Sequence, residues 1–402
     1  MPADPSQAGS PPSPAIPLSR WASRQLAELA EITGSAAIAQ LDGATLLGER
    51  ASNGGYFVPG LRSAGLGGSR LMPTRDGGWF ALTLLRDEDR ALVPAMLGID
   101  CAGPICDEHL AAEVLRWDCD DLLARARDLG LPAASADEAP ASPPHVRTAI
   151  GPTREPPKGR APLVVDLSAI WAGPLAGHLL WLAGATVVKV ENPSRPDLIR
   201  RDDPATFDLI NQGKASALAD LTDAAQRDAV IALIRRADMV IESSRLRALA
   251  HLGIDADQIV RETPGLVWLS VTGHGARGDA AHWAGVGNDC SVAAGLSRAM
   301  VEAGGDMGYV GDALTDPLTG IMAAKLGWQS WLNGEACRTV LSMSAIGAMA
   351  LAEERAIDRA AIDRELLAWS NGRGQPFPAV SRRSMREPVR PLGSDTSQWL
   401  RC

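Results

Sequence analysis

The stretch "PLVVDLSAIWAGPLAGHLLWLAGATVVKVE", residues 162–191, decides the fold of this chain. Residues 162–168 form a short apolar run rich in β-branched side chains, which predicts a buried strand. A turn at 171–174 leads into apolar residues at helical spacing, and 186–191 predict a second strand. A strand, a helix and another strand in immediate succession are typical of a parallel sheet.

The same alternation continues downstream of this stretch. Residues 224–237 have helical spacing, and residues 238–243 and 265–273 predict two further strands. We therefore expect an α/β protein with a doubly wound, mostly parallel, Rossmann-like sheet.

Ligands of such sheets bind beyond the carboxyl ends of the strands. The loops after Ser168, Glu191, Glu242 and Gly273 are therefore the places to look for a site. The first of these loops contains glycine before a helix but does not match GxGxxG, which disfavours an NAD-linked dehydrogenase.

A stretch rich in Pro, Ala and charge, residues 133–162, has no apolar period and is expected to be a linker. Before it, residues 18–132 predict a second, smaller α/β domain. Residues 163–369 are expected to form the large domain, and residues 370–402 a C-terminal tail. Residues 1–17 lack the basic start and apolar run of a signal peptide, and we expect a disordered leader.

The composition excludes several classes of protein. A net charge of -9 over 402 residues disfavours binding to nucleic acid or to an anionic membrane surface. No apolar run approaches the roughly 20 residues of a membrane helix. The six cysteines show neither CxxC pairs nor regular spacing, so we expect no metal site, no disulfide framework and a cytoplasmic protein with reduced thiols.

Five motifs follow one another along the second half of the chain. They are "VVDLSAIWAGPLAGHLLWLAGATVVKVENPSRPDLIR", "FDLINQGKASALADL", "ADMVIESSRLRALAHLGI", "PGLVWLSVTGHGARGD" and "GDALTDPLTGIMAA". In order and spacing they resemble the large domain of the class III CoA-transferases, the group of formyl-CoA and carnitine CoA-transferases and 2-methylacyl-CoA racemases. The resemblance covers roughly residues 160–335.

Residues 60–135 resemble the small domain of the same family, which in its usual members follows these motifs. The resemblance therefore implies that the small domain here precedes the large one. The tail "PVRPLGSDTSQWL" resembles the family's C-terminal end. Cutting and rejoining a chain at exposed linkers keeps the packed units intact.

The resemblance implies transfer of CoA from an acyl-CoA thioester to a carboxylic acid. Asp316, four residues before Gly320 in "DPLTG", matches the family's nucleophile. A carboxylate can form a mixed anhydride, receive CoA as an aspartyl thioester and then be displaced by the acceptor acid. Taken locally, Asp316 before Pro317 also suits a helix cap. Asp312 lies nearby but does not match the motif.

The resemblance also places CoA, as a substrate and not a permanent cofactor, against several loops. The matching positions are Trp171, Ala172, Asn192, Asp220, Leu221, Thr222, Ser243, Ser244, Arg245 and His251. Several depart from the family: formyl-CoA transferase has glutamine at the position of Trp171 and arginine at those of Asn192 and His251. Arg245 or Arg247 can supply a phosphate contact instead, or can be a solvated surface charge.

Two other readings stay open. Asn288 stands where the family's racemases carry a histidine, and an amide cannot act as a general base near pH 7; Asp289 is adjacent. The altered CoA positions also fit a CoA-binding protein without catalysis. His274 can be an acid–base group or an ordinary histidine. Lys189 can pair with a neighbouring carboxylate or contact the ligand. The resemblance implies an interlocked homodimer, with a heterodimer as the alternative.

Overall fold

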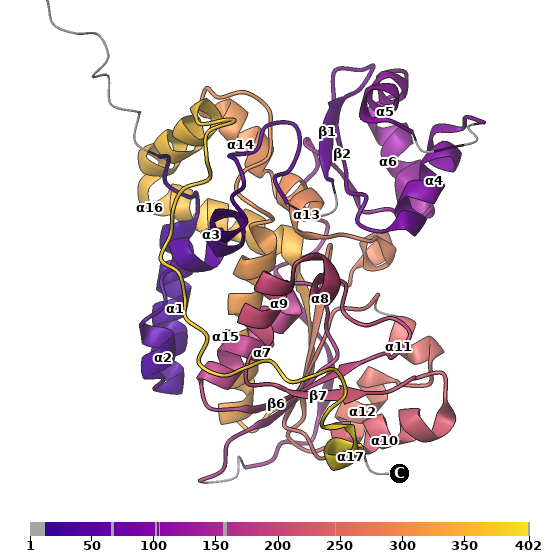
Figure 1. The fold of residues 1–402 in the computed structure, drawn as a ribbon, viewed down its shortest axis with the longest axis vertical. Helices are drawn as coiled ribbons and strands as arrows, with labels where there is room; N and C mark the ends of the chain where they lie inside the picture. The colour runs from indigo at the N-terminus through magenta and orange to yellow at the C-terminus, as the bar shows by residue number, and fades with distance from the viewer. Residues whose placement is uncertain are drawn as a thin grey trace, which may run out of the picture.

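The computed structural model describes residues 13–65, 68–100, 103, 105–155, 159–245 and 247–400. Within these residues the chain forms a sheet of seven strands and a separate sheet of three, each packed against helices (Figure 1). The predicted α/β class, with a mostly parallel sheet and a smaller second unit, is confirmed. Of the expected leader, residues 1–12 lie outside the described residues.

The large sheet is doubly wound. Its strands lie in the order β4 (His145–Gly151), β10 (Ala336–Ser342), β9 (Val267–Thr272), β8 (Met239–Glu242), β5 (Leu163–Asp166), β6 (Thr186–Glu191) and β7 (Ala215–Leu218). Only β4 runs antiparallel to its neighbour among these strands. The chain builds outward from β5 in both directions, so the carboxyl ends of β5 and β8 form the switch point at which ligands bind.

Helices cover both faces of this sheet. The helices α7 (Ala172–Leu182), α9 (Pro204–Asn211) and α15 (Thr315–Leu332) pack on one face, and α10 (Ala224–Arg235) and α12 (Ala256–Glu262) pack on the other. Val164 and Leu269 belong to the first core, whereas Val165 and Trp268 belong to the second. Successive side chains of a strand point to opposite faces, which explains why these strands are apolar throughout.

The first three helices belong to the large unit, which corrects the predicted start of the smaller domain at residue 18. They are α1 (Ser19–Thr33), α2 (Ala36–Ala39) and α3 (Gly43–Asn53). Trp21 and Leu26 are buried in the same core as α15 and the long helix α16 (Met343–Asn371). Arg20 donates to Glu354 of α16 at 2.9 Å. The helical spacing of α1 predicts an apolar face but does not say which core covers it.

The smaller unit contains β1 (Arg70–Pro73), β2 (Trp79–Leu82) and β3 (Ala133–Ser135) in an antiparallel sheet. The helices α4 (Asp87–Leu97), α5 (Asp107–Val114) and α6 (Cys119–Asp128) share its core. The predicted linker at 133–162 therefore has to be corrected, because it contains β3 of the small sheet and β4 of the large one. Both strands lie at sheet edges. Because β4 is mostly exposed, its sequence lacks the alternation of apolar and polar residues that would predict a strand.

Five short helices complete the description of the fold: α8 (Ile199–Asp202), α11 (Ala248–His251), α13 (Gly287–Ala293), α14 (Leu296–Glu302) and α17 (Thr396–Trp399), together with a 3-10 turn at Gly278–His282. No helix in the described ranges combines the length and apolarity needed to cross a membrane.

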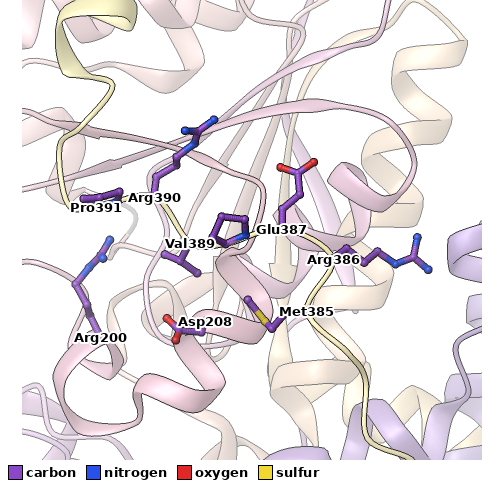
Figure 2. A pocket seen from close by; sticks show the side chains of 9 residues that line it. Arg200, Asp208, Met385, Arg386, Glu387, Val389, Arg390 and Pro391 are labelled. Carbon is purple, nitrogen blue, oxygen red and sulfur yellow. The ribbon is translucent and has the colours of Figure 1, made fainter.

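The C-terminal tail runs from α16 along the large unit to the edge strand β7 (Figure 1). There Asp395 accepts a hydrogen bond from the backbone N–H of Ser216 at 2.9 Å, and Thr396 accepts one from Leu218 at 3.0 Å. These contacts satisfy donors that an open sheet edge would expose. Between the tail and α8 and α9 lies an open groove of about 650 Å³, lined by Arg200, Asp208 and residues 385–391 (Figure 2).

Replacing Leu26 by Ala tests whether α1 is part of the large core. Leu26 is buried in that core, so its truncation is expected to lower the free energy of unfolding by about 2–5 kcal/mol. Leu332→Ala, at an exposed position, is the matched control and should change it by less than about 0.5 kcal/mol. Urea denaturation measures both. Equal midpoints for Leu26→Ala and the parent protein would show that α1 does not support this core.

Candidate active site

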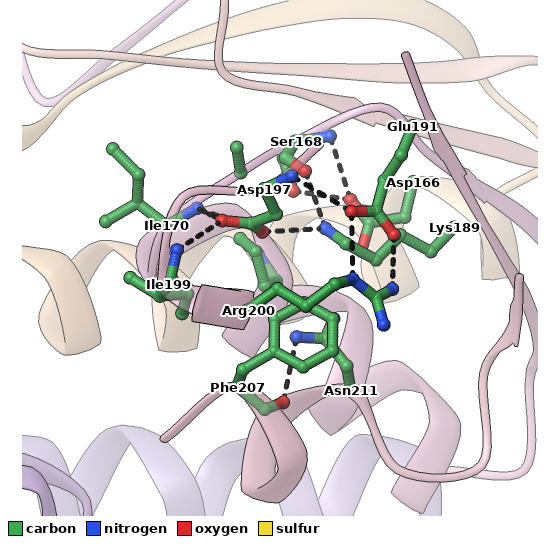
Figure 3. A network of polar contacts seen from close by, with 12 residues as sticks. Asp166, Ser168, Ile170, Lys189, Glu191, Asp197, Ile199, Arg200, Phe207 and Asn211 are labelled. Atoms are coloured by element: carbon green, nitrogen blue, oxygen red, sulfur yellow. Dashed lines mark hydrogen bonds and ion pairs between the residues drawn. The ribbon is translucent and has the colours of Figure 1, made fainter. Parts of the chain in front are cut away.

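A buried polar network lies beneath the loop that follows β5 (Figure 3). Lys214 Nζ donates to Asp166 at 2.8 Å, to Asn211 at 2.9 Å and to the carbonyl of Pro174 at 2.7 Å. Burial lowers the pKa of Lys214 to about 8. Burial also acts to raise the pKa of Asp166, but the two lysines beside it outweigh this effect and hold the pKa below its ordinary value. The network thus keeps ions paired inside the fold.

A second pair holds the loop itself. Lys189 Nζ lies 3.0 Å from Asp197 and donates to the carbonyl of Ser168 at 2.8 Å, which confirms the expected carboxylate partner of Lys189. Asp197 in turn accepts the N–H of Ile170 at 3.1 and 3.2 Å. Ile170 has φ of +72°, an uncommon and strained conformation for a β-branched residue. The ion pair therefore fixes a backbone shape that the side chain of Ile170 opposes.

This loop ends at Ala172, whose backbone N–H donates to the carboxylate of Asp316. A second N–H, from Gly287 of α13, donates to the same carboxylate. Gly287 has to lack a side chain, because a Cβ there would lie 1.9 Å from Asp316 Oδ2. Leu314, not Asp316, occupies the N-cap of α15. The carboxylate thus faces two neighbouring segments and does not cap its own helix.

Burial raises the pKa of Asp316 to about 7, and the nearby Asp312 adds to this effect. Arg50, on α3, counteracts it. Arg50 is paired with Asp312 through Nε at 2.7 Å and Nη2 at 2.5 Å, and both residues are buried. Its guanidinium lies 4.6 Å from the ring centroid of Trp171. No sequence motif singled out Arg50, since its partners come from distant parts of the chain.

Asp316 opens into a cavity of about 530 Å³ at the carboxyl ends of β5, β8 and β9. The large unit contributes Ala169, Ile170, Ala172, Ser243, Ser244, Arg245, Thr272, Gly273 and residues 283–286 to its lining. The smaller unit contributes residues between Leu85 and Leu92 and between Leu129 and Pro132. The cavity thus lies between the two units, at the edge of the sheet that the strand order indicated.

The predicted CoA contacts divide into two groups. Ala172, Ser243, Ser244 and Arg245 line the cavity together with Asp316. In the second group, Trp171 is buried beneath the guanidinium of Arg50. The remaining positions do not line the cavity: Asn192, Asp220, Leu221, Thr222 and His251.

The second group forms local contacts of its own. Asp220 accepts hydrogen bonds from the backbone and the hydroxyl of Thr222 at 3.0 and 2.8 Å, and Asn192 lies 3.5 Å from it. Leu221 packs at the border of the core formed with α10 and α12. His251 is exposed at the end of α11. Arg195, which lines the cavity close to Asn192 in the chain, was not singled out by the sequence.

Further polar residues lie behind the cavity wall. Asn288 accepts the N–H of Ala313 at 3.1 Å and donates to Ser69 at 3.2 Å, so its amide links the two units. Next to it, Asp289 and Cys290 lie with His274 in a buried cluster whose donor atoms are within 4.8 Å of one another and can hold a metal ion. Cysteine spacing could not reveal this cluster, because His274 comes from another loop.

Residues 162–326 match CoA-transferase family III. The match covers β5 to α15 of the large unit, and this stretch is similar to members of that family. Among curated relatives, succinate–glutarate CoA-transferase of Agrobacterium fabrum is 30% identical over 233 residues, which are 55% of this chain and 54% of the relative. Succinyl-CoA:glutarate CoA-transferase of Mus musculus is 30% identical over 167 residues, 40% of this chain and 38% of the relative.

Among solved structures, the hypothetical protein Rv3272 from Mycobacterium tuberculosis aligns with a TM-score of 0.46 at 27% identity, covering 50% of this chain and 59% of that one. A CAIB/BAIF family protein from Brucella suis aligns with a TM-score of 0.45 at 27% identity, covering 51% and 58%. The chain spans about half the length of the curated relative from Agrobacterium. The family III match begins just before β5 and ends within α15, so it contains Asp316.

The raised pKa of Asp316 predicts a pH-dependent cost in stability. The unfolded carboxyl ionises near pH 3.9, whereas the folded one stays protonated until about pH 7. The folded state therefore binds the extra proton between these values, and stability falls as pH rises through this window. Asp316→Asn removes this pH-dependent cost. The free energy of unfolding of the variant should therefore rise relative to that of the parent protein as pH rises, by up to about 4 kcal/mol above pH 7.

Urea denaturation of both proteins at several pH values between about 5 and 8 measures this difference. Glu88→Gln is the control, because Glu88 lines the same cavity but is exposed, and its difference from the parent should not vary with pH. A constant difference for Asp316→Asn as well would show that burial does not perturb this carboxyl group.

Proposed function

We propose that this chain transfers CoA from an acyl-CoA thioester to a carboxylic acid, with Asp316 as the covalent nucleophile. The observation that carries the proposal is the position of Asp316: a buried carboxylate held by two backbone N–H groups at the floor of a cavity. The match of residues 162–326 to CoA-transferase family III supports it, and so do the relatives, whose names specify succinate, glutarate and oxalate as acids.

The reaction proceeds in two exchanges. The Asp316 carboxylate attacks the thioester carbonyl, the C–S bond breaks, and a mixed anhydride forms while CoA leaves as the thiolate. The thiolate then attacks the aspartyl carbonyl of the anhydride, which releases the donor acid as a carboxylate and leaves an aspartyl-CoA thioester. The acceptor carboxylate repeats both steps in reverse order, so that acyl-CoA leaves and the Asp316 carboxylate is restored.

The surroundings of Asp316 suit this chemistry. The N–H groups of Ala172 and Gly287 orient the carboxylate and stabilise its ionised, nucleophilic form. Burial opposes that stabilisation and raises the pKa to about 7, which makes the carboxylate more basic than an exposed one. A cavity that limits water also protects the anhydride and the thioester from hydrolysis.

For the donor, Arg86, Arg195 and Arg245 provide guanidinium groups along the cavity wall, and guanidinium is well suited to phosphate. The smaller unit is proposed to select the acyl group. The segments that carry this role are Leu85–Leu92 and Leu129–Pro132, because they line the cavity. Residues 68–73 also belong to the stretch that resembles the family's small domain, but they do not line the cavity.

Racemisation is the alternative that the geometry disfavours. Both ends of the Asn288 amide are engaged, with the Ala313 N–H and with Ser69, and an amide has no basic lone pair to take a proton. A CoA-binding protein without catalysis remains the second candidate, since Asn192, Asp220 and His251 do not reach the cavity. Detection of the aspartyl adduct separates it from the transferase.

We also propose a homodimer in the cytoplasm, with a heterodimer with a second homologue as the alternative. The family resemblance and the cysteines that are free in the described ranges support this. Sedimentation velocity at micromolar concentration distinguishes these states from a monomer.

Asp316→Asn is the direct test of the mechanism. The amide keeps the size of the side chain but lacks the nucleophile, so transfer should fall by about a thousandfold or more while the protein stays folded. Incubation of the parent protein with an acyl-CoA panel should give the added mass of CoA in intact mass spectrometry. Hydroxylamine should then trap the activated aspartyl group in the peptide that contains Asp316.

Asp208→Asn, the same change at an exposed position outside the cavity, serves as the matched control and should retain both the adduct and the rate. Asp312→Asn should lower stability, because Arg50 loses its buried partner, but the adduct should still form. If folded Asp316→Asn transferred CoA at the rate of the parent protein, Asp316 would not be the covalent nucleophile. Absence of any adduct with every acyl-CoA tested would favour the binding protein.

Arg245→Met tests the phosphate contact. Arg245 lines the cavity, whereas Arg247, two residues away, does not, so Arg247→Met is the matched control. Loss of a charge-assisted hydrogen bond of about 1.5–3 kcal/mol should raise the KM for acyl-CoA roughly 10–150-fold and leave kcat nearly unchanged. Steady-state kinetics over a range of acyl-CoA concentrations measures this. Equal KM values for the two variants would exclude Arg245 from CoA binding.

A further inference from the structure

We propose that His274, Asp289 and Cys290 form a binding site for one divalent cation of the Zn²⁺ type, beside the cavity. The three side chains offer an imidazole nitrogen, a carboxylate oxygen and a thiol sulfur, and these atoms lie within 4.8 Å of one another in the interior. Imidazole, carboxylate and thiolate together are ligands that suit Zn²⁺ and Co²⁺. The site is independent of the transferase chemistry assigned to Asp316.

His274 presents a nitrogen that nothing else uses. Its Nε2 is buried and has no hydrogen-bond partner. The backbone of Ala284 interacts with the ring, whereas Nε2 is left without a partner. A buried polar atom without a partner costs free energy. A ring held by a backbone carbonyl on one nitrogen, with the other free, is the usual arrangement of a metal-binding histidine.

Asp289 is held in the same manner. Its Oδ1 accepts the hydroxyl of Thr83 at 3.0 Å, and the N–H of Val286 lies 3.2 Å from both oxygens. Its Oδ2 lies 3.9 Å from the sulfur of Cys290. These contacts leave Oδ2 facing Cys290, and hydrogen bonds that orient a ligating carboxylate are typical around bound metals. Thr83 belongs to the segment after β2, so both units contribute.

Two glycines leave room beside the donor atoms. A Cβ at Gly285 would lie 2.8 Å from Cys290 Sγ and 2.9 Å from His274 Nε2, and one at Gly273 would lie 3.3 Å from the same sulfur. Both glycines line the cavity. The donor atoms thus lie directly behind two glycines of the cavity wall, and a water molecule is a suitable fourth ligand for a tetrahedral site.

The charges balance when the ion is bound. A thiolate and a carboxylate neutralise the two charges of the cation, and the imidazole stays neutral, so the buried site carries no net charge. Binding releases the proton of the Cys290 thiol and any proton on Asp289 to solvent. No oxidant or reductant takes part, because Zn²⁺ has no redox chemistry.

Titration of the full chain with Co²⁺, after dialysis against a chelator, tests the site. We expect one Co²⁺ per chain, with a thiolate-to-Co²⁺ charge-transfer band in the near ultraviolet and the strong visible bands of a four-coordinate ion. Zn²⁺ should displace Co²⁺ and abolish both signals. These readouts do not depend on transferase activity, so the site and the proposed function can fail separately.

Variants test which residues bind the Co²⁺ that gives the charge-transfer band. Cys290→Ser should remove the charge-transfer band, whereas Cys337→Ser, another buried cysteine that lies beside Ser330 and Thr339, should keep it. Thr83→Val retains every ligand and should weaken Zn²⁺ binding roughly 10–100-fold through the lost support of Asp289. Gly285→Ala also retains every ligand and should block binding by filling the free space.

The proposal is overturned if the parent protein gives no charge-transfer band, or if the band persists in Cys290→Ser. If Cys290→Ser does not fold, Gly285→Ala provides the test, because its methyl group would contact both Cys290 Sγ and His274 Nε2. Unchanged Co²⁺ affinity in folded Gly285→Ala would then place the ion elsewhere, at the exposed Cys106 or at another thiol.

Discussion

The buried ion pairs of Lys214 with Asp166 and of Lys189 with Asp197 are the interactions on which the rest of the site depends. They hold the loop after β5 in a shape that leads the backbone N–H of Ala172 to the carboxylate of Asp316. Removing one member of a buried pair leaves an uncompensated charge and costs about 3–5 kcal/mol. The loop therefore keeps its geometry without needing a bound substrate to impose it.

Opposing effects act on the pKa of Asp316. Burial and the neighbouring Asp312 favour the protonated acid, whereas Arg50 and two N–H groups favour the ion. A fold optimised only for stability would not bury a carboxyl group at this position. A buried carboxyl group that lowers stability in this way is the relation expected between a functional site and the fold around it, which is consistent with the role proposed for Asp316.

The sequence predicted the parallel sheet well, because its strands are apolar on both faces and alternate with helices. The pairing of Lys189 with a carboxylate is also confirmed. The role of Asp316 as nucleophile, inferred from five ordered motifs, stays a prediction. The sequence assigned residues 19–53 to the wrong core, because helical spacing shows an apolar face but not its partner. Arg50 and Asp197 could not be found from local patterns, since their roles come from contacts between segments far apart in the chain.

The position of α1 has a consequence for how the protein forms. Arg20 of α1 meets Glu354 of α16, 334 residues later in the chain. On the ribosome, the apolar face of α1 is therefore made long before the helices α15 and α16 that cover it. Contacts of such long sequence separation slow folding, and unpaired apolar surface invites association in the meantime. Until α15 and α16 have been synthesised, the apolar face of α1 therefore lacks the partners that bury it in the native core.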